Sequence, residues 1–326
     1  MLSLLWTVVL LLSVGAIVWG AETFAKHLAA AASQLGLSTF ALALLLAGAE
    51  PEELATAVTA SIRKLPAIAL GDVVGANLTI CLVALGIGAL MAPLPFGSRV
   101  LRYALLGLPL GAIGVCFAWD GGVTRIEGAI LILLYLAYVA AIWTFERKPP
   151  SLGEVEEIEE AAALRVSRSS RAGRDLLFVL TGIAAMSVGA LILVEAVRRI
   201  TQVEATQTVL GLTLVGFATG FELVVLAWSA ARHGASEAAI AGVVGSFAYN
   251  VTMTTGAAAL VRPLVLHDTA QLHVPLLLML GALGLVILLA TPKKQLGRIE
   301  GFVLLAAYVL VVALILFRNN AVHPVL

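Results

Sequence analysis

Three glutamates lie close together inside an otherwise apolar stretch of the chain. Glu50, Glu52 and Glu53 fall within LLLAGAEPEELATAVTAS, where Pro51 separates the first two. Proline removes a backbone donor and clashes with the carbonyl four residues back, so a helix should kink or break here and free carbonyl oxygens. Ionisable side chains at membrane depth are costly and mark functional sites. Carboxylates beside an interrupted helix therefore predict a cation site.

A similar acidic residue occurs in the second half of the chain. The sequence VVG occurs at 73–75 and again at 243–245, and aligning these two copies without gaps (the VVG alignment) carries Glu52 onto Glu222. Glu222 lies in LTLVGFATGFELVVLAWSA, three positions after Thr219. Positions three apart on a helix share a face, so the threonine and glutamate oxygens should point the same way. Neighbouring apolar stretches add Asp72, Asn77, Ser246 and Asn250. Two glutamates with neutral oxygens are the ligands that a hard cation such as Ca²⁺ prefers.

Membrane-spanning helices must position these side chains. The chain has 326 residues, of which 61% are hydrophobic and 12% are charged, and its mean hydropathy of +1.04 is too high for a soluble domain of this length. A spanning helix needs about 20 apolar residues. We expect ten spans, at 2–20, 37–61, 67–91, 101–119, 124–145, 175–197, 206–231, 237–261, 272–291 and 299–317.

Internal repetition sets the predicted topology. Besides the two copies of VVG, RIEG opens an apolar run at position 125 and again at 298, and SVGA recurs at 13 and 187. Five spans per half is an odd number, so the second copy enters the membrane upside down. The predicted fold is all-α, with ten transmembrane helices arranged as two inverted five-helix repeats, 1–146 and 175–326. We expect the glycines at 71, 75, 242 and 245 to let helices approach closely at the site.

The segment 147–174 joins the two predicted repeats. It begins with two prolines, continues with an acidic run and ends with an arginine at every third position from Arg165 to Arg174. We interpret it as a solvated connector with a short amphipathic helix; the alternative is an acidic cation sensor followed by arginines that contact anionic lipid. With this loop in the cytoplasm, basic residues divide 13 against 7, as the positive-inside tendency requires. Without the loop's six basic residues the division is 7 against 7.

The two acidic segments resemble the paired alpha-repeats of the calcium/cation antiporter superfamily, which includes sodium/calcium and proton/calcium exchangers. That family has ten spans, inverted five-span halves and one essential glutamate per repeat. The LGLS before the second span, the two RIEG sequences and the long middle loop also look like family features. The resemblance implies a secondary active antiporter of the plasma membrane that exchanges Ca²⁺ for Na⁺ or H⁺ by alternating access.

The register of the acids departs from the family patterns. Sodium/calcium exchangers typically read G-T-S-L-P-E, and Glu53 keeps that register in the first repeat, whereas Leu223 occupies it in the second. Proton/calcium exchangers typically read G-N-A-x-E, a register that selects Glu52 and Glu222, the same pair that the internal symmetry selects. We therefore take Glu52 and Glu222 as the central ligands. The remaining predicted cation ligands are Glu53, Glu50, Asp72, Asn77, Thr219, Ser246 and Asn250.

The neutral side-chain oxygens near the acids do not identify the driving ion. Ser246 and Asn250 keep the family's G-S-N-x-x-N/D pattern in the second repeat, while Ala76 and Ile80 depart from it in the first. Fewer neutral oxygens argue against binding of several sodium ions. Na⁺, H⁺ and K⁺ therefore all stay candidates.

Other classes of function find less support in the sequence. No HExxH, Cys/His zinc spacing, phosphate loop or nucleophile elbow occurs, so we expect neither an enzyme nor a bound cofactor. A net charge of zero argues against nucleic acid as a partner; the expected partners are the transported cations and the lipid bilayer, and no obligate protein partner is evident. The alternatives are a metal-dependent lipid enzyme within the membrane, which would need basic residues at membrane depth, and a passive cation channel or non-transporting relative.

Overall fold

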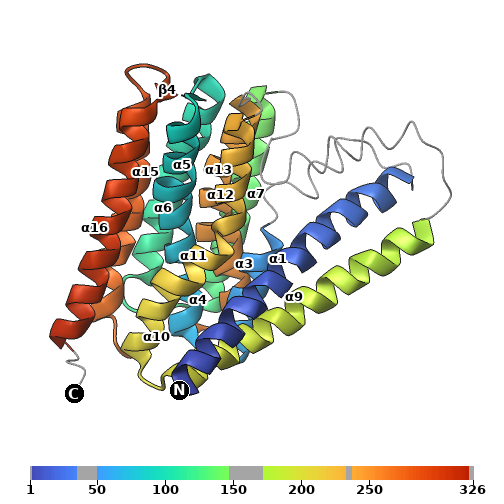
Figure 1. Cartoon of the computed structure of the whole chain (residues 1–326), viewed down its shortest axis with the longest axis vertical. Helices are drawn as coiled ribbons and strands as arrows, with labels where there is room; N and C mark the ends of the chain where they lie inside the picture. The colour runs from blue at the N-terminus through green and yellow to red at the C-terminus, as the bar shows by residue number, and fades with distance from the viewer. Residues whose placement is uncertain (1, 35–49, 147–171, 233–236, 323–326) are drawn as a thin grey trace.

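The described part of the chain is built from helices that pack side by side (Figure 1). The computed structural model describes residues 2–34, 50–146, 172–232 and 237–322. The first half contains α1 (Leu2–Gln34), α3 (Pro51–Ile62), α4 (Pro66–Leu78), the π-helical segment η1 (Thr79–Ala84), α5 (Leu85–Met91), β1 (Leu94–Pro95), α6 (Ser98–Ala118), β2 (Gly122–Val123) and α7 (Arg125–Glu146).

From Phe221 onward, the second half has the same order of elements as the first half has from Pro51 onward. It contains α9 (Ala172–Ile200), α10 (Glu204–Leu210), η2 (Gly211–Val215), α11 (Gly216–Thr219), α12 (Phe221–Arg232), α13 (Glu237–Tyr249), η3 (Asn250–Thr254), α14 (Thr255–Val261), β3 (Leu264–Val265), α15 (Ala270–Ala290), β4 (Gln295–Leu296) and α16 (Arg298–Val322). Of the expected connector 147–174, residues 147–171 lie outside the described residues.

Eight helices within the described residues are long and apolar enough to cross a membrane. The expected span at 37–61 is described only from residue 50 onward, where it contains α3, and the expected span at 237–261 is the continuous run of α13, η3 and α14. The all-α membrane fold expected from the sequence is confirmed. Helices predominate because a backbone in lipid must satisfy its own hydrogen bonds.

The helices α1 and α9 run antiparallel and form a tilted pair beside the remaining bundle (Figure 1). They can approach closely because Gly20 has no side chain: a β-carbon there would lie 2.8 Å from the carbonyl oxygen of Gly182. The first span was expected to end at residue 20, but α1 continues to Gln34. Its polar extension is accommodated by α9, since His27 Nδ1 lies 2.9 Å from Asp175 Oδ1.

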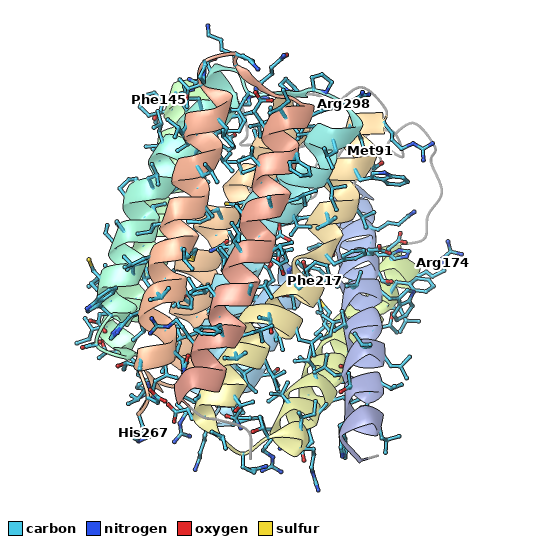
Figure 2. The ribbon with its side chains drawn as sticks, turned by 60° about the vertical axis from the view of Figure 1, so that its left-hand side comes forward. Met91, Phe145, Arg174, Phe217, His267 and Arg298 are labelled. Carbon is cyan, nitrogen blue, oxygen red and sulfur yellow. The ribbon has the colours of Figure 1, made fainter. Side chains whose placement is uncertain are left out.

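Two short antiparallel sheets join the halves at opposite ends of the bundle. β1 pairs with β4 and β2 pairs with β3, so each sheet takes one strand from each half. Met91, Phe145 and Arg298 lie at one end of the molecule, whereas His267 lies at the other (Figure 2). β1 and β3 follow equivalent helices of the two halves but lie at opposite ends of the bundle, and the same holds for β2 and β4. Inverted repeats produce this arrangement.

Candidate functional site

The first half presents its acids at the start of a helix. Glu50 has non-helical backbone angles (φ −97°, ψ 77°), and α3 begins directly after it at Pro51. The helix start at Pro51 agrees with the break predicted there, while residues 35–49, which precede it, lie outside the described residues. Glu52 and Glu53 lie in the first turn, where unpaired backbone N–H groups and the helix dipole favour negative charge.

The second half is interrupted at the equivalent position. Helix α11 ends at Thr219, Gly220 has φ −72° and ψ −1°, and α12 begins at Phe221. The VVG alignment relates Gly220 to Glu50 and Phe221 to Pro51. Glu222 therefore lies in the first turn of α12, as Glu52 does in α3. In both repeats a helix thus begins at the equivalent position and carries an acid in its first turn.

The acids of three helices face one another inside the bundle. Glu50, Glu52, Glu53 and Asp72 are all buried, with exposed fractions of 4%, 1%, 0% and 0%. Glu52 interacts electrostatically with Glu222, Glu50 and Glu53. Glu53 interacts with Asp72 as well as with Glu50 and Glu222. Glu222 itself is only partly buried.

The carboxylates do not by themselves form a closed metal cage. Across the described ranges, no three side chains of aspartate, glutamate, histidine or cysteine gather as closely as metal ligands do. A cation bound among them must therefore also use neutral oxygens, which Ca²⁺ accepts readily.

Neutral side chains link the two repeats at this level. The Thr219 hydroxyl donates a hydrogen bond to Asp72 Oδ1 over 2.8 Å, and the Ser246 hydroxyl donates to Glu50 Oε1. Each bond joins a residue of the first half to one of the second. The predicted site residues therefore meet at the boundary between the repeats.

An amide pair extends the same boundary. Asn250 Nδ2 donates to Asn77 Oδ1 over 3.4 Å, and Asn77 Nδ2 lies 3.5 Å from the Met279 sulfur atom. Both asparagines are completely buried. All nine predicted ligands thus belong to one connected region, in which Asn77 and Asn250 contact each other and Glu53 interacts with Asn250.

Several buried oxygens in this region have no hydrogen-bond partner among the residues that the structure describes. They are both carboxylate oxygens of Glu52, both of Glu53, Asp72 Oδ2, Asn250 Oδ1 and Thr56 Oγ1. A buried carboxylate without a partner is costly, and the cost falls when a proton or a cation neutralises it. The arrangement can therefore bind cations or exchange them for protons.

Close helix contact holds the two halves together here. A β-carbon at Gly75 would lie 2.4 Å from the carbonyl oxygen of Leu212, and one at Gly71 would lie 2.9 Å from that of Thr208. The close approach expected of glycines 71 and 75 is confirmed. This close approach brings α4, which carries Asp72, against η2 and against α11, the helix that ends at Thr219.

Two tyrosines beside the acids were not predicted from the sequence. Tyr135 of α7 and Tyr249 of α13 stack edge to face with ring centroids 5.3 Å apart. Tyr135 interacts electrostatically with Glu50, and Tyr249 interacts with Glu50, Glu52 and Glu53. Aromatic residues in apolar spans usually pack against neighbours, so their type carried no signal. The position of Tyr249 directly before Asn250 was the available clue.

The chain belongs to the sodium/calcium exchanger family, a family of cation antiporters. The family model described as sodium/calcium exchanger protein matches residues 5–144 and 175–317. The two matched blocks correspond to the two halves of the fold.

Individual relatives and solved structures agree with this membership. The chain is 26% identical over 335 aligned positions to the sodium/calcium exchanger MaX1 of Methanosarcina acetivorans, covering 92% of this chain and 95% of the relative. It is 25% identical over 302 positions to an uncharacterized membrane protein of Methanocaldococcus jannaschii, covering 91% of each. A structure of the sodium-calcium exchanger NCX_Mj shares the fold with a TM-score of 0.61 and 21% identity, covering 95% of this chain and 98% of that one.

Proposed function

We propose that this protein is a secondary active antiporter that exchanges Ca²⁺ for Na⁺ or H⁺ across the plasma membrane. The observation that carries the proposal is the set of buried carboxylate oxygens on Glu52 and Glu53, which have no hydrogen-bond partner among the described residues. Both glutamates face Glu222 across the repeat boundary, and Glu53 also interacts with Asp72 of its own repeat. Family membership supports antiport as the reaction class. The choice between Na⁺ and H⁺ is part of the test below.

The proposed exchange follows from the electrostatics of the site. Ionised carboxylates that share a dry region repel one another and lose their hydration. A bound Ca²⁺ balances two of these charges, and protons or Na⁺ can replace it on the same groups. Because the empty, fully charged site is unfavourable, the protein changes conformation only when an ion occupies it. This condition couples the movement of one ion to that of the other.

The proposed conformational change moves one group of helices relative to another. The α1–α9 pair lies beside the bundle that carries the acids (Figure 1). It faces its surroundings with apolar side chains, including Leu12 and Leu180, which are 70% and 63% exposed. A displacement of this pair relative to the bundle would open the site to one side at a time. We further propose that the repeats comprise residues 1–146 and 175–326, with the connecting loop in the cytoplasm.

Uptake of radiolabelled Ca²⁺ into proteoliposomes tests the proposal. We expect uptake when an outward Na⁺ gradient or an outward H⁺ gradient is imposed, and the effective gradient identifies the driving ion. Glu52→Gln and Glu222→Gln should each abolish the exchange while the protein still elutes as a single species in detergent. Glu195→Gln is the matched control, because Glu195 pairs with Arg198 and Arg199 on the surface of α9.

The results discriminate among the candidate functions. Wild-type uptake by either Glu52→Gln or Glu222→Gln would refute the site. A Ca²⁺ flux that does not depend on the Na⁺ or H⁺ gradient would indicate a channel instead of an antiporter.

A further inference from the structure

A cavity lies at the end of the bundle that carries His267, and its lining includes none of the predicted cation ligands (Figure 2). Its volume is about 840 Å³, and its lining includes Pro66, Arg125 and Glu204. Three of the membrane-spanning helices begin at these residues. The cavity therefore lies at the depth where the chain enters the membrane, among the first turns of α4, α7 and α10.

Positive charge dominates the lining. Lys64, Arg125 and Arg262 all line the cavity, together with His267 and a single acid, Glu204. The carboxylate of Glu204 accepts backbone hydrogen bonds from His267 over 2.7 Å and from Asp268 over 3.1 Å. The one acid is thus already occupied in holding the loop before α15. Three permanent cations around one engaged carboxylate attract an oxyanion.

The cations are held together by a contact between the repeats. Lys64 follows α3 with a left-handed backbone (φ 63°), which is uncommon for a residue with a side chain. The Ser61 hydroxyl one turn earlier lies 2.7 Å from the carbonyl oxygen of Ala258 and 3.1 Å from that of Arg262. This bond fixes the end of α3 against the end of α14. It places Lys64 of the first half and Arg262 of the second half on the same cavity.

Exposed apolar side chains line the cavity beside the cations. Ile62, Val261 and Val265 are 58%, 44% and 56% exposed. A free phosphate ion would gain nothing from these groups. A phospholipid would use both parts of the surface, because its phosphate meets the cations while its acyl chains cover the apolar side chains.

The positive charge of this cavity is mostly not repeated at the equivalent positions of the other half. In the VVG alignment, the sequence equivalents of Arg262 and Lys64 are Ala92 and Gly234. Arg125 alone has a cationic counterpart, Arg298 in the second RIEG sequence. The cationic set is therefore a property of one end of the molecule.

We propose that this cavity binds the phosphate headgroup of an anionic phospholipid, with Lys64, Arg125 and Arg262 as the headgroup ligands. The lipid would connect the ends of α3 and α14 and so stabilise the contact between the repeats at this end of the bundle. The proposal does not depend on which ions the protein exchanges, because lipid binding is measured without transport.

Native mass spectrometry of the purified full chain tests this proposal. The protein in detergent is titrated with phosphatidylglycerol, with phosphatidylcholine and, separately, with inorganic phosphate. Each lysine or arginine near an anionic lipid contributes about five-fold in affinity, so the double variant Lys64→Gln with Arg262→Gln should weaken phosphatidylglycerol binding by about 30-fold. The matched control is Arg63→Gln, since Arg63 precedes Lys64 but does not line the cavity.

The outcomes separate a lipid site from general charge attraction. We expect the wild-type protein to prefer phosphatidylglycerol to phosphatidylcholine, the Arg63→Gln protein to behave like the wild type, and the charge-conserving pair Lys64→Arg with Arg262→Lys to retain binding. Unchanged phosphatidylglycerol binding by the double glutamine variant would overturn the proposal. So would equal loss in Arg63→Gln, or displacement of the lipid by inorganic phosphate at comparable concentration.

Discussion

Gly75→Ala should disrupt the cation site without placing any new group in it. A β-carbon at position 75 would lie 2.4 Å from the carbonyl oxygen of Leu212, whereas ordinary contact begins at 3.4 Å. The obstacle is backbone, so it cannot rotate away, and α4 must move from η2 by about 1 Å if the whole difference is relieved by separation. Asp72 lies three residues before Gly75 on the same face of α4.

The same separation would break the bond between Thr219 and Asp72. That bond spans 2.8 Å, and an increase of about 1 Å exceeds the range of a hydrogen bond. A hydrogen bond to a charged group contributes about 1.5–3 kcal/mol, which corresponds to about 10-fold to 150-fold in an equilibrium constant. We therefore expect the Ca²⁺ concentration for half-maximal uptake to rise by at least about 10-fold in proteoliposomes.

Gly284→Ala is the matched control for this substitution. It makes the same change in a helix of the bundle, but a β-carbon at position 284 would meet nothing within 4 Å. Alanine also favours helix over glycine by about 1 kcal/mol, so this variant should be as stable as the wild type or more so. Equal half-saturation in Gly75→Ala and Gly284→Ala would refute the argument that close packing of α4 on η2 positions Asp72.

Two further perturbations test the polar contacts of the site. Thr219→Val removes the hydroxyl bonded to Asp72 and should weaken Ca²⁺ half-saturation by about 10-fold, whereas Thr213→Val in the same span removes only a bond to the backbone carbonyl of Val209 and should change it little. Lowering the pH should raise the Ca²⁺ concentration for half-maximal uptake, because protons compete for the buried carboxylates of Glu52 and Glu53. The test covers about pH 5 to 8, the range in which folded proteins are usually most stable. A half-saturating Ca²⁺ concentration that does not change over this range would show that these carboxylates do not bind the cargo.

The sequence was sufficient to predict a helix boundary at Pro51 but not the break at Gly220. Pro51 imposes a helix start through its missing N–H. Thr219 and Glu222 were expected to share one helical face, but α11 ends at Thr219 and α12 begins at Phe221, where no proline marks the break. The glycines at 71 and 75 were identifiable because small residues at helical spacing permit close approach. These features depend on local chemistry and on the repeat, both of which are visible in a single chain.

The partners of each side chain could not be predicted in the same way. Which residue meets Asp72, Glu50 or Asn77 depends on how the inverted halves dock, and Thr219, Ser246 and Asn250 follow them in the chain by 147, 196 and 173 residues. The π-helical segments were also missed. Their wider turns occur in runs such as TICLVA and GLTLV, whose composition differs little from that of ordinary apolar helix.

Two of the π-helical segments, η1 and η3, occur at matching places in the two halves. η1 spans Thr79–Ala84 and η3 spans Asn250–Thr254, and the VVG alignment superimposes most of their length. Such segments are frequent at functional sites because they rotate the following residues out of helical register. Here η3 begins at Asn250, whose Nδ2 donates to Asn77 and whose Oδ1 has no hydrogen-bond partner within the described ranges. The repetition indicates that the distortion belongs to the fold and serves the site.

Anomalous X-ray diffraction from crystals grown with Sr²⁺ in place of Ca²⁺ tests the central claim most directly. The account predicts an anomalous peak at the repeat boundary, with ligand oxygens from Glu52 or Glu53 of α3 and from Glu222 of α12 in the same coordination shell. A peak bound only by residues of one repeat, or found at the membrane surface while these carboxylates face lipid or water separately, would contradict it.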